Sequence, residues 1–387
     1  MCRDQKGEKM KRSFIREILE HATNDTISFA GGLPDETLFP CNDLRASAHH
    51  ILGDSRSLQY GTTQGYLPLR NKIAQRYREE GFETSAENIM ITSGSQQALD
   101  IISRYHWGEK ITIEAPSYLG AMNLFVLNRL EQDAVALYSD GIDTQVFDKS
   151  MARSRLAYLI PDFQNPSGCT YTMDKRTAVA KSIATHQGIL IEDAPYSALY
   201  FKKKHQCISA LLPEQSFHLG SFSKVLAPGL RLGWIRADKK LLEPIIAYKE
   251  AMDLHSNGLS QYILDHYLTD PNRYQNHTAM LRNIYRKKMQ VFKTYLDELM
   301  PEFIYTLPEG GMFIYGRLPG ISTSELVANA LKQGVLFVPG REFYLDHDRD
   351  DEIRLNFTHC SAREVYRGLS ILARLYREHY SVRQRSA

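Results

Sequence analysis

The sequence predicts an α/β protein with a mainly parallel, seven-stranded sheet flanked by helices, plus a smaller α+β domain. Between about residues 66 and 270, short apolar runs alternate with longer helical patterns, which is typical of strand–helix–strand units. After Asp270-Pro271 the pattern changes to one long charged helix and a second group of short strands. A chain of 387 residues is long enough for two domains.

The seven strands are expected where apolar residues cluster over three or four positions. In chain order they are Ile89–Ile91, Ile111–Ile113, Val135–Leu137, Ala157–Ile160, Ile189–Ile191, Phe217–Leu219 and Leu232–Ile235. A helix is expected from Met173 to His186, where a Gln-Gly pair stops it. The smaller region should contain, in order, a helix over Tyr274–Leu299, strands near Met312–Tyr315, Val335–Val338 and Ile353–Phe357, and a C-terminal helix.

These patterns suggest four segments. Residues 1–28 form an N-terminal arm, with a helix expected over Ser13–His21, and residues 29–55 begin the small domain. Residues 56–270 form the large domain, and residues 271–387 complete the small domain, including the long interdomain helix. The small domain is therefore expected to be assembled from both ends of the chain.

Composition excludes several classes of protein. The net charge is +2 with Lys and Arg scattered, so neither nucleic acid nor an anionic membrane is an expected partner. No stretch has the length and apolarity of a membrane span, and the start MCRDQKGEKMKR lacks an apolar signal-peptide segment. The five cysteines lie far apart without a C-x-x-C pair, which indicates reduced thiols, no metal site and a cytoplasmic location.

Polar residues follow the predicted strands at the edge where open α/β sheets bind ligands. In TSGSQQALD, Gly94 permits a turn, and Ser95 and Gln96 open a helix whose N–H groups suit an anion. Alternatively, Ser95 is simply a helix cap. In EAPSYLG, Tyr118 starts the next helix, where its ring either faces a planar ligand or packs in the core.

The next strand ends supply an amide and a carboxylate. PDFQNPSG places Asn165 before a proline, and EDAPYSALY places Asp193 after a buried strand with Tyr196 three residues on. Each feature is common on its own. A buried carboxylate normally has a partner, so Asp193 is either a satisfied structural group or binds a cationic nitrogen.

The stretch GSFSKVLAPGLRLGW sets Lys224 among small hydroxyl residues inside an apolar run. Ser221, Ser223 and Arg231 suit a bound phosphate, and a desolvated lysine beside it would be a reactive amine. A lysine at a strand end near a turn is also ordinary. The order of all these strand-end residues, however, is improbable by chance.

In that order and in its motifs SGSQQAL, PDFQNPSG, EDAPYSAL and SFSKVLAPGLRLGW, the sequence resembles the fold-type I pyridoxal-phosphate enzymes. It is most similar to the class I/II aminotransferases, in the branch of the 2-aminoadipate and kynurenine aminotransferases. The resemblance runs from about Ser28 to the C-terminus. It implies pyridoxal 5'-phosphate as cofactor.

The resemblance implies roles for the matching residues. Lys224 would form the Schiff base with the cofactor and then shuttle the Cα proton. Asp193 would hold the pyridine nitrogen protonated, Asn165 and Tyr196 would hydrogen-bond the phenolic oxygen, and Tyr118 would stack on the ring. The residues implied for the phosphate are Ser95, Gln96, Ser221, Ser223 and Arg231.

Further matches concern the substrate and the assembly. Arg354 resembles the arginine that grips the substrate α-carboxylate, the alternative being an arginine paired with a nearby acid. Gly31 and Gly32, with Asn165, would line the substrate pocket. Arg16 resembles an arginine that reads a distal carboxylate, although it is equally expected to face solvent. Tyr60 resembles a tyrosine lent to a neighbouring subunit's phosphate site, which implies a homodimer with shared active sites.

The implied activity is amino-group transfer between an L-amino acid and a 2-oxo acid by a ping-pong mechanism. One pair would be 2-oxoglutarate and glutamate, and the donors would be 2-aminoadipate-like or broad. The alternatives are a β-lyase or a decarboxylase on the same scaffold, and a regulatory sensor behind a winged-helix domain. Only about 28 residues precede FAGGLP, too few for such a domain. The connection IISRYHWGE is shorter than the family's usual one, so atypical packing is expected there.

Overall fold

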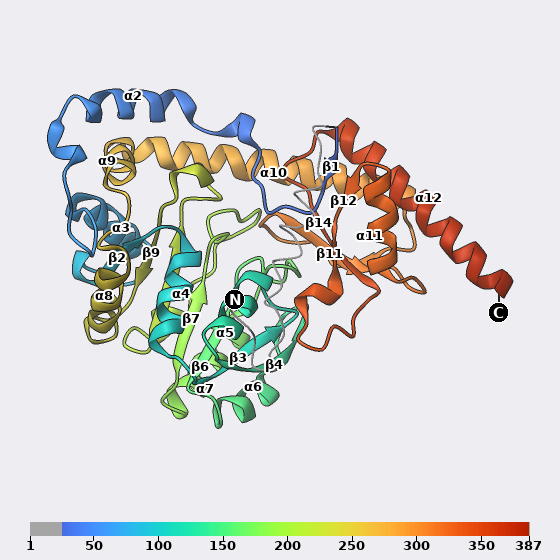
Figure 1. Cartoon of the computed structure of the whole chain (residues 1–387), viewed down its shortest axis with the longest axis horizontal. Coiled ribbons are helices and arrows are strands. Elements are labelled where there is room, and N and C mark those ends of the chain that lie inside the picture. The colour runs from blue at the N-terminus through green and yellow to red at the C-terminus, as the bar shows by residue number, and fades with distance from the viewer. Residues whose placement is uncertain (1–24, 387) are drawn as a thin grey trace.

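The computed structural model describes residues 25–386, so the helix expected over Ser13–His21 lies outside the described part of the chain. An eight-stranded sheet forms the larger body (Figure 1). From one edge to the other its strands are β2 (Ile89–Thr92), β9 (Gly233–Arg236), β8 (Ser216–Ser221), β7 (Ile189–Asp193), β6 (Leu156–Leu159), β3 (Lys110–Ala115), β4 (Glu131–Tyr138) and β5 (Gly141–Ile142).

The α/β fold with a mainly parallel sheet is confirmed, and each of the seven expected strands is present. Strands β4, β3, β6, β7 and β8 run parallel, whereas β9 is antiparallel to both its neighbours. The eighth strand, β5, is a two-residue return that pairs antiparallel with the end of β4. Two residues are too few to give an apolar run, so the sequence does not predict this strand.

Alternation along β6 shows how helices cover both faces of the sheet. Leu156 and Tyr158 point into the larger core with α5 (Leu119–Leu127), where the Tyr158 ring meets Phe125 edge-on at 5.4 Å between centroids. Ala157 and Leu159 point to the other side, into a second core with α6 (Thr144–Met151) and α7 (Met173–Thr185). A strand buried on both faces reads as the continuous apolar run seen in the sequence.

Five other helices of the described residues precede the long helix at 271–299. They are α2 (Cys41–Leu52), α3 (Leu67–Glu79), α4 (Ser95–Tyr105), α8 (Lys239–Asp253) and α9 (Gly258–Tyr267). After α4, only four residues lead to β3, in the connection that the sequence marks as short. There Trp107 is half exposed and lies under the Arg129 guanidinium, 5.3 Å from the ring centroid.

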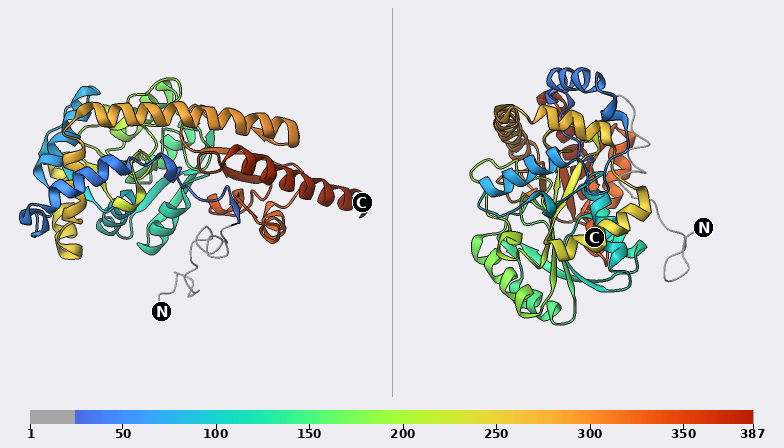
Figure 2. Two further views of the ribbon diagram at one scale, coloured as in Figure 1. Left: turned by 90° about the horizontal axis from the view of Figure 1, so that it is seen from above. Right: turned by 90° about the vertical axis from the view of Figure 1, so that its left-hand side faces the viewer.

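The long helix α10 (Pro271–Leu299) links the larger body to the smaller one (Figures 1 and 2). It begins three residues before the expected Tyr274. The Asp270 side chain accepts a hydrogen bond from Asn272 N at 3.0 Å, and Pro271 occupies the first turn, where a missing N–H costs nothing. These two residues are a start signal that the apolar spacing alone does not show.

The smaller body contains an antiparallel sheet and brings together segments far apart in the sequence. Its strands, in sheet order, are β10 (Ile304–Tyr305), β11 (Phe313–Arg317), β14 (Glu352–Asn356) and β13 (Val338–Pro339). Beside it, β1 (Ile27–Ser28) pairs in parallel with β12 (Val335–Leu336). Helices α11 (Thr323–Lys332) and α12 (Ala362–Ser386) complete it, and α12 packs along α10 (Figure 2).

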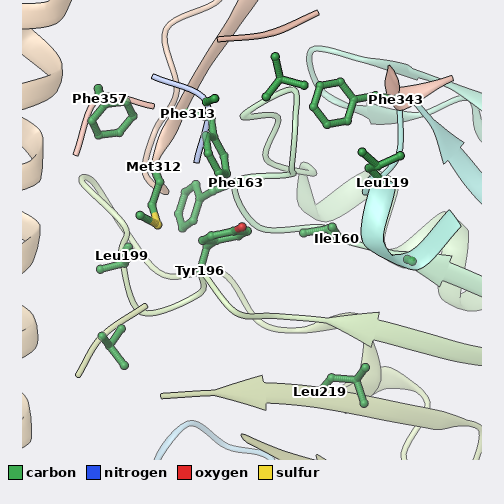
Figure 3. Close-up of a cluster of buried hydrophobic side chains, with 14 of the residues drawn as sticks. Leu119, Ile160, Phe163, Tyr196, Leu199, Leu219, Met312, Phe313, Phe343 and Phe357 are labelled. Carbon is green, nitrogen blue, oxygen red and sulfur yellow. The ribbon is translucent and has the colours of Figure 1, made fainter. Parts of the chain in front are cut away.

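An apolar cluster joins the two sheets next to Tyr196 (Figure 3). The Tyr196 ring meets Phe313 edge-on at 5.8 Å, and Phe163 lies beside it. Backbone bonds reinforce the junction, with Gly311 N donating to Leu199 O at 3.0 Å. Tyr196 is therefore held from both bodies. Within residues 25–386, no helix has the length and apolarity needed to cross a membrane.

Candidate active site

A cavity of about 590 Å³ lies at the carboxyl ends of the parallel strands, where the sequence predicts the site. Apart from Tyr60, every predicted site residue within the described 25–386 lines it. These are Gly31, Gly32, Ser95, Gln96, Tyr118, Asn165, Asp193, Tyr196, Ser221, Ser223, Lys224, Arg231 and Arg354. Segments up to 323 residues apart therefore meet around one space.

Lys224 supplies an amine in the wall of this cavity. Its Nζ donates a hydrogen bond to Gly32 O at 2.9 Å. Burial lowers the pKa of Lys224 to about 8, and repulsion from Arg354 and Arg231 adds to this, while Asp193 opposes it. An amine with that pKa is partly neutral near pH 8, so it can act as a nucleophile or accept a proton.

Asp193 ends β7 and reaches the cavity from the sheet. Burial raises the pKa of its carboxyl to about 7, although Tyr158 and Lys224 oppose the shift. Oδ2 accepts a hydrogen bond from Tyr158 OH at 3.0 Å. Oδ1 is buried and has no hydrogen-bond partner within the described residues. An unsatisfied buried carboxylate oxygen is costly, and a cationic N–H donor from a ligand would satisfy it.

Tyr158 was not predicted as a site residue. It lies in the apolar run of β6, fully buried, and its only polar atom reaches the carboxylate at the end of the neighbouring strand. The feature of the sequence that could have identified Tyr158 is a hydroxyl within an apolar strand, since a buried tyrosine normally has a hydrogen-bond partner. Tyr158 touches the cavity only through Asp193, so it is a positioning residue.

Glu114 is a second residue that sequence reasoning missed. It ends β3 and is buried, which raises its pKa to about 7. Its carboxylate accepts hydrogen bonds from Gln164 Nε2 at 2.9 Å and Tyr171 OH at 2.8 Å. Gln164 in turn accepts from Ser167 N at 2.9 Å. These bonds fix the loop that carries Asn165. The feature of the sequence that could have identified Glu114 is an acid at a strand end, in the motif EAPSYLG from which only the tyrosine was predicted as a site residue.

Arg354 projects from β14 into the cavity and is 1% exposed. Its Nη1 donates to Asn165 Oδ1 at 2.7 Å, Nη2 donates to Ala30 O, and Nε has no partner within the described residues. Asn165 Nδ2 donates to Tyr196 OH at 3.4 Å. Burial lowers the pKa of Arg354 to about 10.

The alternative that Arg354 serves a structural ion pair is wrong, because it makes no ion pair with any acid of residues 25–386. Its guanidinium lies over the Phe313 ring, 4.3 Å from the centroid, and near Phe343 at 5.1 Å. A cation held on aromatic faces without a carboxylate retains its capacity for an anionic ligand.

The N-terminus of α4 forms the anion side of the cavity. Gly94, with φ +88°, occupies the cap position, and no side chain caps the helix. Ser95 is the first helical residue rather than the cap, so that alternative is wrong. A Cβ at position 94 would lie 3.1 Å from Arg231 Nη2. Arg231, itself at φ +52°, donates from Nη2 to Ser93 O at 3.0 Å.

Other polar groups complete this side. Ser221 Oγ accepts from Ser223 N at 3.1 Å, which directs both residues into the cavity wall. Tyr118 OH donates to Gln96 Oε1 at 3.2 Å, and the Gln96 amide donates to Gly120 O at 3.2 Å. A helix N-terminus, hydroxyls and a guanidinium form a phosphate-binding set.

Two predicted residues are not brought to the cavity. Tyr60 is 80% exposed, and its ring meets His255 edge-on at 5.8 Å. Arg16 lies outside the described residues.

Fold and cavity together define a fold-type I enzyme, and comparison with known proteins identifies its family. The class I and II aminotransferase family matches residues 25–372. The chain therefore belongs to the class I and II aminotransferases. The family match covers most of the chain, and relatives that align with almost all of it are named aminotransferases. The protein is therefore an amino-group transferase.

Three relatives show how close the likeness is. An aromatic-amino-acid aminotransferase of Thermococcus litoralis is 35% identical over 97% of this chain and 94% of its own length. A 2-aminoadipate transaminase of Thermus thermophilus is 33% identical over 95% of this chain and 94% of its own length. The crystal structure of a Pyrococcus horikoshii kynurenine aminotransferase, a complex with PMP, matches with a TM-score of 0.90 and 33% identity, over 97% of this chain and 96% of that one. The predicted family and fold are confirmed.

Proposed function

We propose that this chain is a pyridoxal-phosphate-dependent aminotransferase whose cofactor lies in the 590 Å³ cavity, covalently attached to Lys224. The observation that carries the proposal is the unpartnered Oδ1 of Asp193, which shares one cavity with the amine of Lys224 and the anion-binding end of α4. When bound, the cofactor withdraws electrons from the substrate Cα and weakens its bonds.

The chain's own residues would hold the cofactor at three points. Oδ1 of Asp193 would accept a hydrogen bond from the ring nitrogen and so keep it protonated, while Tyr158 holds Oδ2. Asn165 and Tyr196 would face the ring's phenolic oxygen, and Tyr118 would cover one ring face. The phosphate would be held by Ser95, Gln96, Ser221, Ser223 and Arg231.

Arg354 supports transfer of the amino group over loss of the carboxylate. Asn165 fixes its Nη1, and its Nε has no partner within the described residues, so the guanidinium keeps a donor for the substrate α-carboxylate. A carboxylate held by Arg354 would be restrained, which would disfavour its loss as CO₂. Lys224 Nζ, with a pKa of about 8, would carry the proton from the substrate Cα.

The reaction is proposed to run as two half-reactions in a ping-pong sequence, with glutamate and 2-oxoglutarate as one pair. The names of the relatives support 2-aminoadipate-like or broad amino donors. Leu119, Leu124 and Leu127 line the same cavity and suit an apolar donor side chain. Arg16 is proposed, from the sequence alone, to read a distal carboxylate in acidic donors.

The assembly is proposed to be a homodimer in which Tyr60 completes the phosphate site of the second copy. Its 80% exposure leaves the ring available for such a contact.

We also propose the domain limits 29–55, 56–270 and 271–387, since the large sheet lies within 89–236 and the antiparallel sheet within 304–356. The free cysteines of the described residues support a cytoplasmic location.

A panel of amino donors and 2-oxo acceptors tests the function. The holoenzyme should convert at least one pair, and Lys224→Ala should abolish turnover, while Lys240→Ala, an exposed lysine of α8, should not change it. Release of CO₂, or of ammonia with a 2-oxo acid, in place of the transaminated product would contradict the proposal in favour of a decarboxylase or a lyase.

A further inference from the structure

A second cavity, of about 370 Å³, lies between α3 and α10, apart from the catalytic cavity. Lys72 and Arg76 line it from α3, and Tyr274 and Arg282 line it from α10. Spacings of four and eight residues place each pair on one helix face. The loop with Tyr200 closes the third side. Its volume is that of sites that hold small molecules.

Among the described residues, two arginines in this cavity have no acidic partner. Arg76 Nη1 is buried without a hydrogen-bond partner among residues 25–386, and its guanidinium lies over the Tyr274 ring, 3.7 Å from the centroid. Arg282 lies over Tyr200 at 4.4 Å, and its Nη1 donates to Ala198 O at 3.3 Å. A guanidinium stacked on a ring keeps its N–H edge for a bidentate anion.

The other charged residues of the lining are already engaged. Lys72 Nζ pairs with Asp265 at 2.8 Å, and Lys204 pairs with Glu80. The remaining acid, Glu79, accepts a hydrogen bond from a glutamine of its own helix at 2.9 Å and keeps its negative charge. The lining therefore holds four basic residues against two acids, and within residues 25–386 the basic residues without an acidic partner are the two stacked arginines.

We propose that this cavity is a binding site for a small oxoanion, a dicarboxylate or a phosphate, held by Arg76 and Arg282. Two guanidinium forks match a ligand with two negative charges. This site does not depend on the proposed reaction, since none of the residues that hold the ligand lines the catalytic cavity.

A ligand in this second cavity should also affect the catalytic cavity, through the loop that follows Tyr196. Arg282 holds Ala198 O, two residues after Tyr196, so a ligand that draws Arg282 away loosens the loop that follows Tyr196. A small space of about 50 Å³ lies between the two cavities and shares Arg76 with one and Ser221 with the other. The anion is therefore expected to alter turnover as well as to bind.

Calorimetric titration of the cofactor-loaded protein with succinate, and separately with inorganic phosphate, tests the site. Arg76→Gln and Arg282→Gln should each weaken binding about tenfold or more, because each removes a charge-assisted contact. Arg286→Gln, an exposed arginine one turn further along α10, should bind as the wild type does. Loss with succinate alone identifies a dicarboxylate site, and loss with phosphate alone identifies a phosphate site.

Two further observations keep the test decisive. Each variant is first shown to keep the wild-type cofactor absorbance, so that a lost fold is not read as a lost site. In the wild type, amide exchange in residues 197–204 should change when the ligand is added, and in Arg282→Gln it should not. The proposal is overturned if neither anion binds, or if all four proteins bind both anions equally, since succinate bound only beside Arg354 would give that result.

Discussion

Replacement of Asp193 by asparagine should stabilise the apoenzyme while weakening its hold on the cofactor. The folded chain raises the pKa of Asp193 from 3.8 to about 7 because the carboxyl is buried. With a raised folded pKa, the contribution of Asp193 to stability is fully present below about pH 4 and is lost as the pH rises through about 7. Three pKa units correspond to about 4 kcal/mol. The isosteric, uncharged Asp193→Asn should avoid that loss.

Urea unfolding of the two apoenzymes measures this difference. At pH 8 the variant should be more stable by up to about 4 kcal/mol, a figure that already includes the opposing attraction between Asp193 and Lys224, and near pH 4 the two should be equal. Glu114 also titrates near pH 7, and the charge of Asp193 adds to the rise of its pKa. Removal of that charge in Asp193→Asn therefore acts in the same direction, toward a more stable variant at high pH. Affinity for pyridoxal phosphate should fall, because the ring nitrogen loses its anionic partner. A stability difference that does not grow with pH would refute the reasoning.

Three further predictions concern neighbouring groups. Arg354→Gln should lower kcat/KM for every amino donor by about thirtyfold or more, as expected when a buried charge partner is removed; losses confined to some donors would contradict its role. Tyr158→Phe keeps the ring contact with Phe125 but removes the hydrogen-bond donor to Asp193 Oδ2. The pKa of Asp193 should therefore rise, and the pH above which apoenzyme stability stops falling should rise by about one unit. An unchanged pH profile would contradict the role of Tyr158. Gly94→Ala should weaken cofactor binding by about tenfold through contact with Arg231. Gly108→Ala, also at a positive φ of +78° but with nothing within 4 Å, should bind the cofactor normally; equal losses in both variants would contradict a role for the contact with Arg231.

Elements with a strong local signal were predictable from the sequence. The buried strands read as apolar runs because helices cover both faces of the sheet, as in β6. The two-residue β5 has no run to read, and the start of α10 is set by Asp270 and Pro271 rather than by periodicity. Apolar periodicity carries no information on such short strands or on the residues that cap a helix.

The candidate site divides in the same way. Site residues that directly follow a strand could be predicted from the sequence, and in the structure they lie around one cavity. Tyr158 and Glu114 act through contacts between strands and loops far apart in the sequence, so their roles depend on the register of the sheet. The two arginines of the second cavity were likewise invisible, because α3 and α10 are almost 200 residues apart.

Borohydride reduction of the cofactor-loaded protein, followed by peptide mass spectrometry, identifies the lysine that holds the cofactor, because reduction makes the bond between the two permanent. We predict a phosphopyridoxyl group on Lys224 and on no other lysine. A label on Lys249, the fully buried lysine that pairs with Asp253 at 2.6 Å, or no label at all, would contradict it.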